Sequence, residues 1–197
     1  MKACILLGNT RAKSNTEKLT KVFVENLEAD GVEVVQIPLR LKNVQTCVGC
    51  DVCHEVFDEF GCAINDDMQE IAQEILSSDL VVFTSPIYSW MPTPPLKAVM
   101  DRMYAFTKYP EEGDGFNLLT KQIFAMIATS DEPCEENCDL FDEAVRRLAS
   151  FADRHYLGSL TARAQEVEDE IEQKVLDEAK SFAGKCHAVV VSCSVLW

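Results

Sequence analysis

Four cysteines gathered between residues 47 and 62 are the side chains of this sequence best suited to chemistry. They follow the spacing Cys47-x2-Cys50-x2-Cys53, and Cys62 comes later in the same loop. Closely spaced thiolates can hold a corner of an iron–sulfur cluster, and four thiolates also suit a structural zinc ion. A third interpretation is a set of thiols that bind no metal. The spacing alone leaves these three alternatives open.

A polar loop at residues 8–16 follows the apolar run of residues 2–7 and precedes a helical pattern. Such a loop at a helix N-terminus presents backbone N–H groups and the positive end of the helix dipole, which suits a phosphate. Arg11, Ser14, Asn15 and Thr16 add side-chain donors. The alternative is a well-capped turn without a ligand, with Ser14 or Asn15 as the N-cap. A Walker loop is excluded because its Gly-Lys-Ser/Thr end is missing.

A second loop, residues 84–95, follows another apolar run at residues 80–83. Loops at the carboxyl ends of strands are where open parallel sheets bind ligands. Tyr88, Trp90 and Met91 would form an apolar wall for a flat ring, or would cover the edge of the core.

Hydrophobic patterns predict an alternation of strands and helices along the chain. This alternation indicates one domain, residues 1–197, of the α/β class, with a parallel doubly wound sheet. The apolar tail at residues 184–197 is β-prone from residue 188 and predicts an edge strand or a contribution to a subunit interface. We expect strands at 2–7, 32–37, 80–83, 122–129 and 156–161, and helices at 16–29, 66–76 (capped by Asp66), 96–106, 140–152 and 166–183.

The composition restricts the partners and the compartment. A net charge of −15 argues against binding to nucleic acid or to an anionic membrane, because both require a basic face. Nine cysteines without export features or an apolar run of membrane-spanning length predict a reduced, cytoplasmic protein. Cys134 and Cys138 are one helical turn apart and do not by themselves indicate a metal site.

Taken together and in order, these motifs resemble the NADPH-dependent FMN reductase and iron–sulfur flavoprotein group of the flavodoxin-like fold. The resemblance extends over residues 2–183. It rests on the two loops above and the cysteine spacing, together with Asp66-Asp67-Met68, Ser85-Pro86-Ile87-Tyr88, Pro95-Leu96-Lys97 and Asp101-Arg102.

The resemblance implies a three-layer fold whose five-stranded sheet has the order 2-1-3-4-5, with FMN bound between the ends of strands 1 and 3. It places the FMN phosphate at Asn9, Arg11, Ser14, Asn15 and Thr16. The edge of the flavin ring would lie along Pro86, Ile87, Tyr88, Ser89 and Trp90, and its other side near Thr129, Ser130 and Asp131. This chain departs from similar proteins after the fourth expected strand, where Asp131-Glu132-Pro133-Cys134 replaces a loop that often carries glycines.

Three functions follow as hypotheses. The first is an oxidoreductase that takes hydride from NADH or NADPH onto FMN and passes electrons to a quinone, a flavin or an aromatic compound. FMN would supply the redox chemistry, so no residue is predicted to be catalytic. The second is an electron carrier with a [4Fe-4S] cluster on Cys47, Cys50, Cys53 and Cys62 and a ferredoxin-type partner. The third is a flavodoxin-fold binding module without redox turnover.

The resemblance also implies a homodimer or homotetramer. The acidic surface would slow encounter with anionic nicotinamide cofactors unless cations such as Arg11, Lys97 or Arg102 compensate for it.

Overall fold

The computed structural model describes residues 1–164 and 171–194 of the chain. Its centre is a parallel sheet of five strands in the order β2-β1-β3-β6-β7, as the sequence predicts. The strands are β1 (Lys2–Leu7), β2 (Glu33–Pro38), β3 (Leu80–Pro86), β6 (Ile123–Ser130) and β7 (His155–Arg163).

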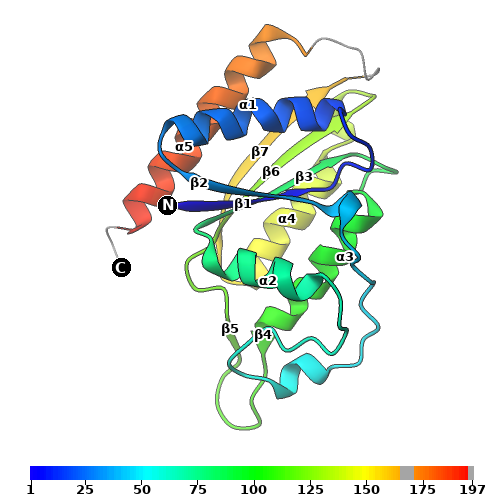
Figure 1. The fold of residues 1–197 in the computed structure, drawn as a ribbon, viewed down its shortest axis with the longest axis vertical. Helices are drawn as coiled ribbons and strands as arrows, with labels where there is room; N and C mark the ends of the chain where they lie inside the picture. The colour runs from blue at the N-terminus through cyan, green and yellow to red at the C-terminus, as the bar shows by residue number, and fades with distance from the viewer. Residues whose placement is uncertain (165–170, 195–197) are drawn as a thin grey trace.

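Helices cover both faces of the sheet (Figure 1). One face carries α1 and α5, and the other carries α2, α3 and α4. The helices are α1 (Asn15–Ala29), α2 (Met68–Ser77), α3 (Pro94–Arg102), α4 (Asp139–Phe151) and α5 (Gln173–Ser194). The three-layer α/β architecture is therefore the expected one.

Strand β1 shows how the sequence divides the core into two halves. Side chains alternate between the faces of a strand, so Cys4 and Leu6 pack with α2, α3 and α4. Ala3, Ile5 and Leu7 pack on the opposite face with α1 and α5. Because both faces are buried, the strand reads as a continuous apolar run rather than an alternating one.

Several element boundaries differ from the predictions. Helix α2 begins at Met68 after Asp67 rather than at Asp66, although the Asp66 carboxylate accepts a hydrogen bond from the Met68 N–H at 3.1 Å. A short antiparallel hairpin, β4 (Thr107–Lys108) and β5 (Phe116–Asn117), was not anticipated. Two-residue strands carry too little periodicity to be recognised from the sequence.

The edge strand expected in the apolar tail was wrong, whereas a contribution of the tail to a subunit interface stays a prediction. The part of the tail that the structure describes, up to Ser194, continues helix α5 instead of forming an edge strand. Tertiary packing overrides the β propensity of its valines, because Cys186 and Val190 are buried in the core that α5 shares with α1. Phe182 contacts Phe23 of α1 with ring centroids 5.8 Å apart. Residues 166–170 of the predicted last helix and residues 195–197 of the tail lie outside the described residues.

Within residues 1–164 and 171–194, no helix combines the length and the apolar character needed to cross a membrane.

Candidate functional site

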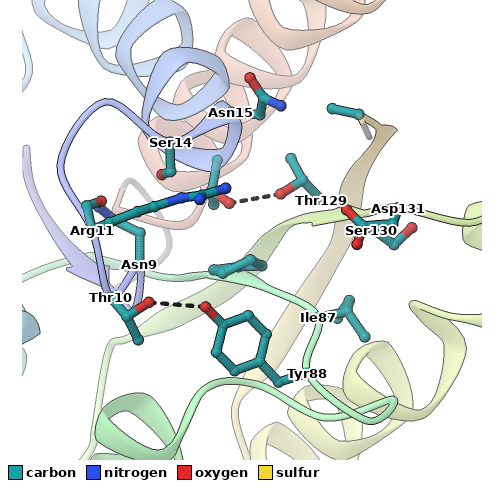
Figure 2. Close-up of a pocket in the computed structure, with 13 residues that line it drawn as sticks. Asn9, Thr10, Arg11, Ser14, Asn15, Ile87, Tyr88, Thr129, Ser130 and Asp131 are labelled. Atoms are coloured by element: carbon teal, nitrogen blue, oxygen red, sulfur yellow. Dashed lines mark hydrogen bonds between the residues drawn. The ribbon is translucent and has the colours of Figure 1, made fainter. Parts of the chain in front are cut away.

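A pocket of about 150 Å³ opens where β1, β3 and β6 end (Figure 2). At this point the connection from β1 leads to α1 on one face of the sheet, and the connection from β3 leads to α3 on the other face. Doubly wound sheets bind ligands where their connections diverge in this way. The pocket is lined by Asn9, Thr10, Arg11, Ser14, Asn15, Thr16, Pro86, Ile87, Tyr88, Thr129, Ser130, Asp131 and Ala164. These comprise every predicted cofactor-binding residue except Ser89 and Trp90.

The N-terminus of α1 forms one wall of this strand-end pocket. Ser14 is the N-cap, and its hydroxyl accepts a hydrogen bond from the Glu17 N–H at 3.2 Å. The Glu17 carboxylate reaches back to the Lys13 N–H at 2.6 Å, close to the reciprocal arrangement of a capping box. These contacts fix the loop where the helix dipole favours an anion.

Asn9 connects the end of β1 to this wall. Its side chain is 1% exposed, and its amide donates a hydrogen bond to the Arg11 carbonyl at 2.7 Å. The Asn9 Oδ1 atom is buried and has no hydrogen-bond partner among the described residues. A buried, unpaired acceptor costs free energy unless a ligand or water satisfies it, so Asn9 indicates a ligand with a donor group.

The opposite wall comes from β3 and β6. The Thr16 and Thr129 hydroxyls share a hydrogen bond of 2.6 Å, which ties the start of α1 to the end of β6. The Ile87 N–H donates to the Thr129 carbonyl at 2.8 Å, and the Ala164 N–H donates to the Ser130 carbonyl at 2.9 Å. The pocket floor is therefore held by the backbones of neighbouring strands.

Tyr88 closes one side of the pocket. Its hydroxyl lies 2.9 Å from the Thr10 Oγ1 atom, so the loop after β3 contacts the loop after β1 (Figure 2). Backbone hydrogen bonds between Tyr88 and Met91 then form a two-residue turn, whose central residues Ser89 and Trp90 have φ values of 49° and 64°. This turn directs Trp90 to the surface, where it is 54% exposed, and explains why neither central residue lines the pocket.

The sequence did not single out Thr10 and Ala164 as pocket residues. Thr10 was overlooked because its side-chain contact with Tyr88 joins loops that are distant in sequence. Arg11 was predicted, and Figure 2 shows its side chain extending across the pocket towards Thr129. It is exposed, so a positively charged group is available at the pocket mouth.

The cysteine loop lies beside a second pocket, of about 100 Å³. Cys47, Cys50, Cys53 and Cys62 all line it, so the structure brings the four predicted ligands around one hollow. Gly61 allows a close turn just before Cys62, because it has a φ of 67° and a Cβ there would lie 2.5 Å from the Val56 Cβ. The lining is completed by Val48, Gly49, Asp51, Ala63, Ile64, Asp101, Arg102, Tyr104 and Ala105.

A buried ion pair anchors this loop to α3. Arg102 donates two hydrogen bonds to the Asp66 carboxylate, at 2.6 and 2.7 Å, and both side chains are essentially inaccessible to solvent. The Arg102 guanidinium also donates to the Cys62 Sγ atom at 3.2 Å. Arg102 is therefore unavailable as a surface cation for a nicotinamide cofactor, and Lys97 is paired with Asp101 at 2.5 Å.

Burial and hydrogen bonds shift the pKa values of three ionisable groups around the cysteine pocket. Burial opposes ionisation of Asp66, but hydrogen bonds from Arg102, Gln45 and Met68 outweigh it and hold the pKa of Asp66 below its usual value. Lys108 is fully buried and donates to the carbonyls of Cys53 and Phe60 at 2.9 and 3.3 Å. Burial lowers the pKa of Lys108 and raises that of the Cys53 thiol.

In the part of the chain that the structure describes, no three His, Cys, Asp or Glu side chains are grouped closely enough to hold one metal ion. The four thiols are therefore not arranged as a preformed zinc site. A cube of four irons is larger than one ion and separates its ligand sulfurs further.

Comparison with known proteins identifies relatives of this chain. The family model described as "NADPH-dependent FMN reductase" matches residues 1–136. An iron–sulfur flavoprotein of Archaeoglobus fulgidus is 32% identical over 110 residues, which are 56% of this chain and 49% of the relative. The putative NAD(P)H-dependent FMN-containing oxidoreductase YwqN of Bacillus subtilis is 24% identical over 136 residues, 68% of this chain and 69% of the relative.

Among solved structures, the FMN-dependent NADH-azoreductase of Bacillus anthracis, in complex with FMN, superposes with a TM-score of 0.69 at 18% identity. The superposition covers 94% of this chain and 99% of the azoreductase, and it shows that the fold is flavodoxin-like. The chain spans about half the length of the iron–sulfur flavoproteins that it matches.

The buried ion pair generates a stability prediction. Replacing Arg102 by Gln leaves the Asp66 carboxylate buried without a counter-charge, so we expect the free energy of unfolding to fall by about 3–5 kcal/mol. The matched control is Asp101→Asn, which breaks the neighbouring exposed pair with Lys97 and should cost less than about 1 kcal/mol. Urea unfolding followed by circular dichroism measures both changes.

The same pair determines a pH dependence. Because the folded-state pKa of Asp66 is lowered, its stabilising contribution is complete above the unfolded pKa of about 3.9 and is lost as the pH falls through the folded value. The Arg102→Gln variant should lose part of this acid sensitivity. If Arg102→Gln and the control Asp101→Asn lowered the free energy of unfolding equally, the buried pair would not anchor the loop.

Proposed function

Because the chain belongs to the family of NADPH-dependent FMN reductases, we propose that its strand-end pocket binds FMN and that the protein is an oxidoreductase using NAD(P)H. A quinone, a flavin or an aromatic compound would accept the electrons. The observation that carries this proposal is the convergence of the loops after β1, β3 and β6 on one pocket at the switch point of the sheet.

The phosphate of FMN fits the wall made by the β1–α1 loop. The N-terminus of α1 supplies backbone N–H groups and a favourable dipole, and the Arg11 side chain supplies a cation. The hydroxyls of Ser14 and Thr16 lie on the same wall. The unpaired Asn9 Oδ1 atom would accept a hydrogen bond from a hydroxyl of the ribityl chain.

The size of the pocket indicates how the loops would adjust. Its volume of about 150 Å³ is smaller than the roughly 300–1,000 Å³ of most small-molecule sites. The Tyr88–Thr10 hydrogen bond bounds it on the side of the exposed Trp90 turn. Breaking that single side-chain contact would widen the pocket without disturbing the strands, so the loop after β3 is the part that would move around a flavin ring.

Bound FMN would supply the redox chemistry, because its ring accepts a hydride from a nicotinamide and returns electrons to an acceptor. The residues of this chain would bind and orient the partners. Arg11 and the α1 N-terminus would hold the phosphate, Ile87 and Pro86 would provide an apolar wall, and Tyr88 would limit the entry of water.

Binding to the phosphate is the first test of this proposal. We expect the protein to bind FMN more tightly than riboflavin, because only FMN carries the charge that the α1 N-terminus and Arg11 recognise. Arg11→Ala should weaken FMN binding about tenfold or more and leave riboflavin binding nearly unchanged. Arg147→Ala, which removes a 76% exposed arginine on α4, is the matched control. Fluorescence titration of each flavin measures these affinities.

The same variants test turnover. Anaerobic addition of NADPH or NADH to the FMN-loaded protein should bleach the flavin absorbance, and a quinone should restore it. The Arg11→Ala variant should lose activity at limiting FMN and regain it at saturating FMN, since Arg11 acts only in binding. Equal affinities for FMN and riboflavin, or flavin that nicotinamides never reduce, would contradict the proposal.

The cysteine pocket supports a second candidate function, that of an electron carrier with a [4Fe-4S] cluster. The four thiols line one hollow, and the buried cations Arg102 and Lys108 lie against the chain segments that carry Cys62 and Cys53. Four thiolates are the usual ligands of such a cluster. The positive charge of Arg102 is already balanced by Asp66, and burial lowers the pKa of Lys108, so the thiols carry this hypothesis. In this case a ferredoxin-type protein, rather than a small acceptor, would exchange electrons with the chain.

Iron and sulfide content distinguishes the two candidates. The carrier hypothesis predicts about four irons and four acid-labile sulfides per chain after anaerobic purification, with broad visible absorbance beyond the flavin bands. Cys50→Ser should lower the iron content, whereas the control Cys193→Ser on α5 should not. Iron-free protein with intact flavin absorbance would eliminate the carrier and leave the reductase.

A further inference from the structure

A second pair of thiols lies outside both sites already described. Cys134 belongs to a short 3₁₀ turn after β6, and Cys138 is the N-cap residue of α4. The Cys138 N–H donates to the Cys134 carbonyl at 2.8 Å, so the two residues are one turn apart. Their sulfur atoms lie 3.5 and 3.7 Å from the same Ser130 hydroxyl, so both thiols are directed to one point.

The two thiols differ in reactivity. A hydrogen bond from Cys138 lowers the pKa of Cys134 to about 6; burial opposes this shift, and hydrogen bonds from Ser130 and Thr161 add to it. The pKa of Cys138 is raised by its hydrogen bond to Cys134 and by burial. Cys134 is therefore a thiolate near neutral pH while Cys138 keeps its proton, which is the division between an attacking and a resolving cysteine.

The two thiols also differ in their exposure to solvent, and the more reactive one is the more exposed. Cys134 is partly exposed, whereas Cys138 is 2% exposed and lies behind it. Both line an open pocket of about 310 Å³ between α4 and β7. Its other lining residues are Ser159 and Thr161 from β7 and the carboxylates of Glu135, Asp139, Asp142 and Glu143.

The remaining thiols of the core provide the contrast. Burial raises the pKa of Cys4 and of Cys186 to about 12, and neither side chain is exposed. They are expected to be inert. Cys134 and Cys138 therefore differ from Cys4 and Cys186 in combining a stabilised thiolate, an adjacent thiol and an open pocket.

We propose that Cys134 and Cys138 form a dithiol–disulfide couple that reduces small cationic or neutral disulfides. The Cys134 thiolate attacks one sulfur of the disulfide, forms a mixed disulfide and releases one thiolate. Cys138 then loses its proton and attacks the Cys134 sulfur, which releases the second thiolate and closes the Cys134–Cys138 disulfide. The substrate gains two electrons and the protein dithiol loses two, and low-molecular-weight thiols return the protein to its reduced form.

The acidic lining determines the choice of substrate. Glu143 is paired with Arg146 and Arg147, so the negative charge of the lining comes from Glu135, Asp139 and Asp142. These carboxylates repel anionic disulfides such as oxidised glutathione and attract cationic ones such as cystamine. Ser130 also lines the strand-end pocket, so the two sites are adjacent. The exchange reaction does not require FMN, and its test is independent of the proposed function.

The test uses a tryptic peptide that the sequence provides. Cleavage after Lys121 and Arg146 yields residues 122–146, in which Cys134 and Cys138 are the only cysteines. The reduced whole protein is mixed anaerobically with cystamine, with the neutral hydroxyethyl disulfide or with oxidised glutathione. Samples are then quenched with acid, alkylated, digested and analysed by mass spectrometry.

We expect the peptide to lose two hydrogens as the internal disulfide forms, about tenfold or more faster with cystamine than with oxidised glutathione. Cys138→Ser should stop the reaction at the mixed disulfide on Cys134, and Cys134→Ser should give neither product. Glu135→Gln with Asp139→Asn should reduce the preference for cystamine, while Cys193→Ser should change nothing. A peptide that stays a dithiol, or a mixed disulfide that forms first on Cys138, would overturn the proposal.

Discussion

The site depends on the parallel pairing of β1 with β3, because the two chain connections that leave these strands turn to opposite faces of the sheet. The last contact of this pairing is the Gly8 N–H, which donates to the Thr84 carbonyl at 2.7 Å. A Cβ on Gly8 would lie 2.7 Å from the same oxygen, so only glycine permits the approach. Thr93 donates to the Gly8 carbonyl at 2.5 Å and fixes the start of α3 against this point. The pocket lies beside this point, among the N-terminus of α1 and the loops that follow β1, β3 and β6.

A second constraint joins the cysteine loop to that framework. The loop has little regular structure, and the buried Arg102–Asp66 pair takes the place of a helix or strand in holding it. Removing two charges from water is costly, and good geometry with further hydrogen bonds is needed to offset the cost. Arg102 meets this requirement by also contacting Cys62 and the Ile64 carbonyl. The end of α3 and the segment that carries Cys62 are therefore one structural unit.

The sequence allowed prediction of what depends on local pattern. Five strands, five helices and an N-cap at Ser14 or Asn15 were readable because apolar periodicity and capping chemistry are encoded within a few residues. Contacts between distant segments were not readable: the Thr10–Tyr88 bond, the burial of Arg102 and the shared contact of Cys134 and Cys138 with Ser130. The edge strand expected in the tail was wrong because packing of Val190 in the core shared with α1 overrides β propensity. Trp90 was placed in the site because a left-handed turn at two non-glycine residues has no clear sequence signal.

Hydrogen–deuterium exchange with and without FMN tests most directly the claim that the strand-end pocket is the flavin site. We predict that FMN slows exchange of backbone N–H groups in residues 9–16, at the α1 N-terminus, and in residues 86–91 and 129–131. Hydrogen exchange in α2 and in β2 should be unchanged, because no residue of either element lines the pocket. Protection confined to another surface, such as the hollow between the β4–β5 hairpin and the end of α4, would contradict the account. No protection at saturating FMN would contradict it equally.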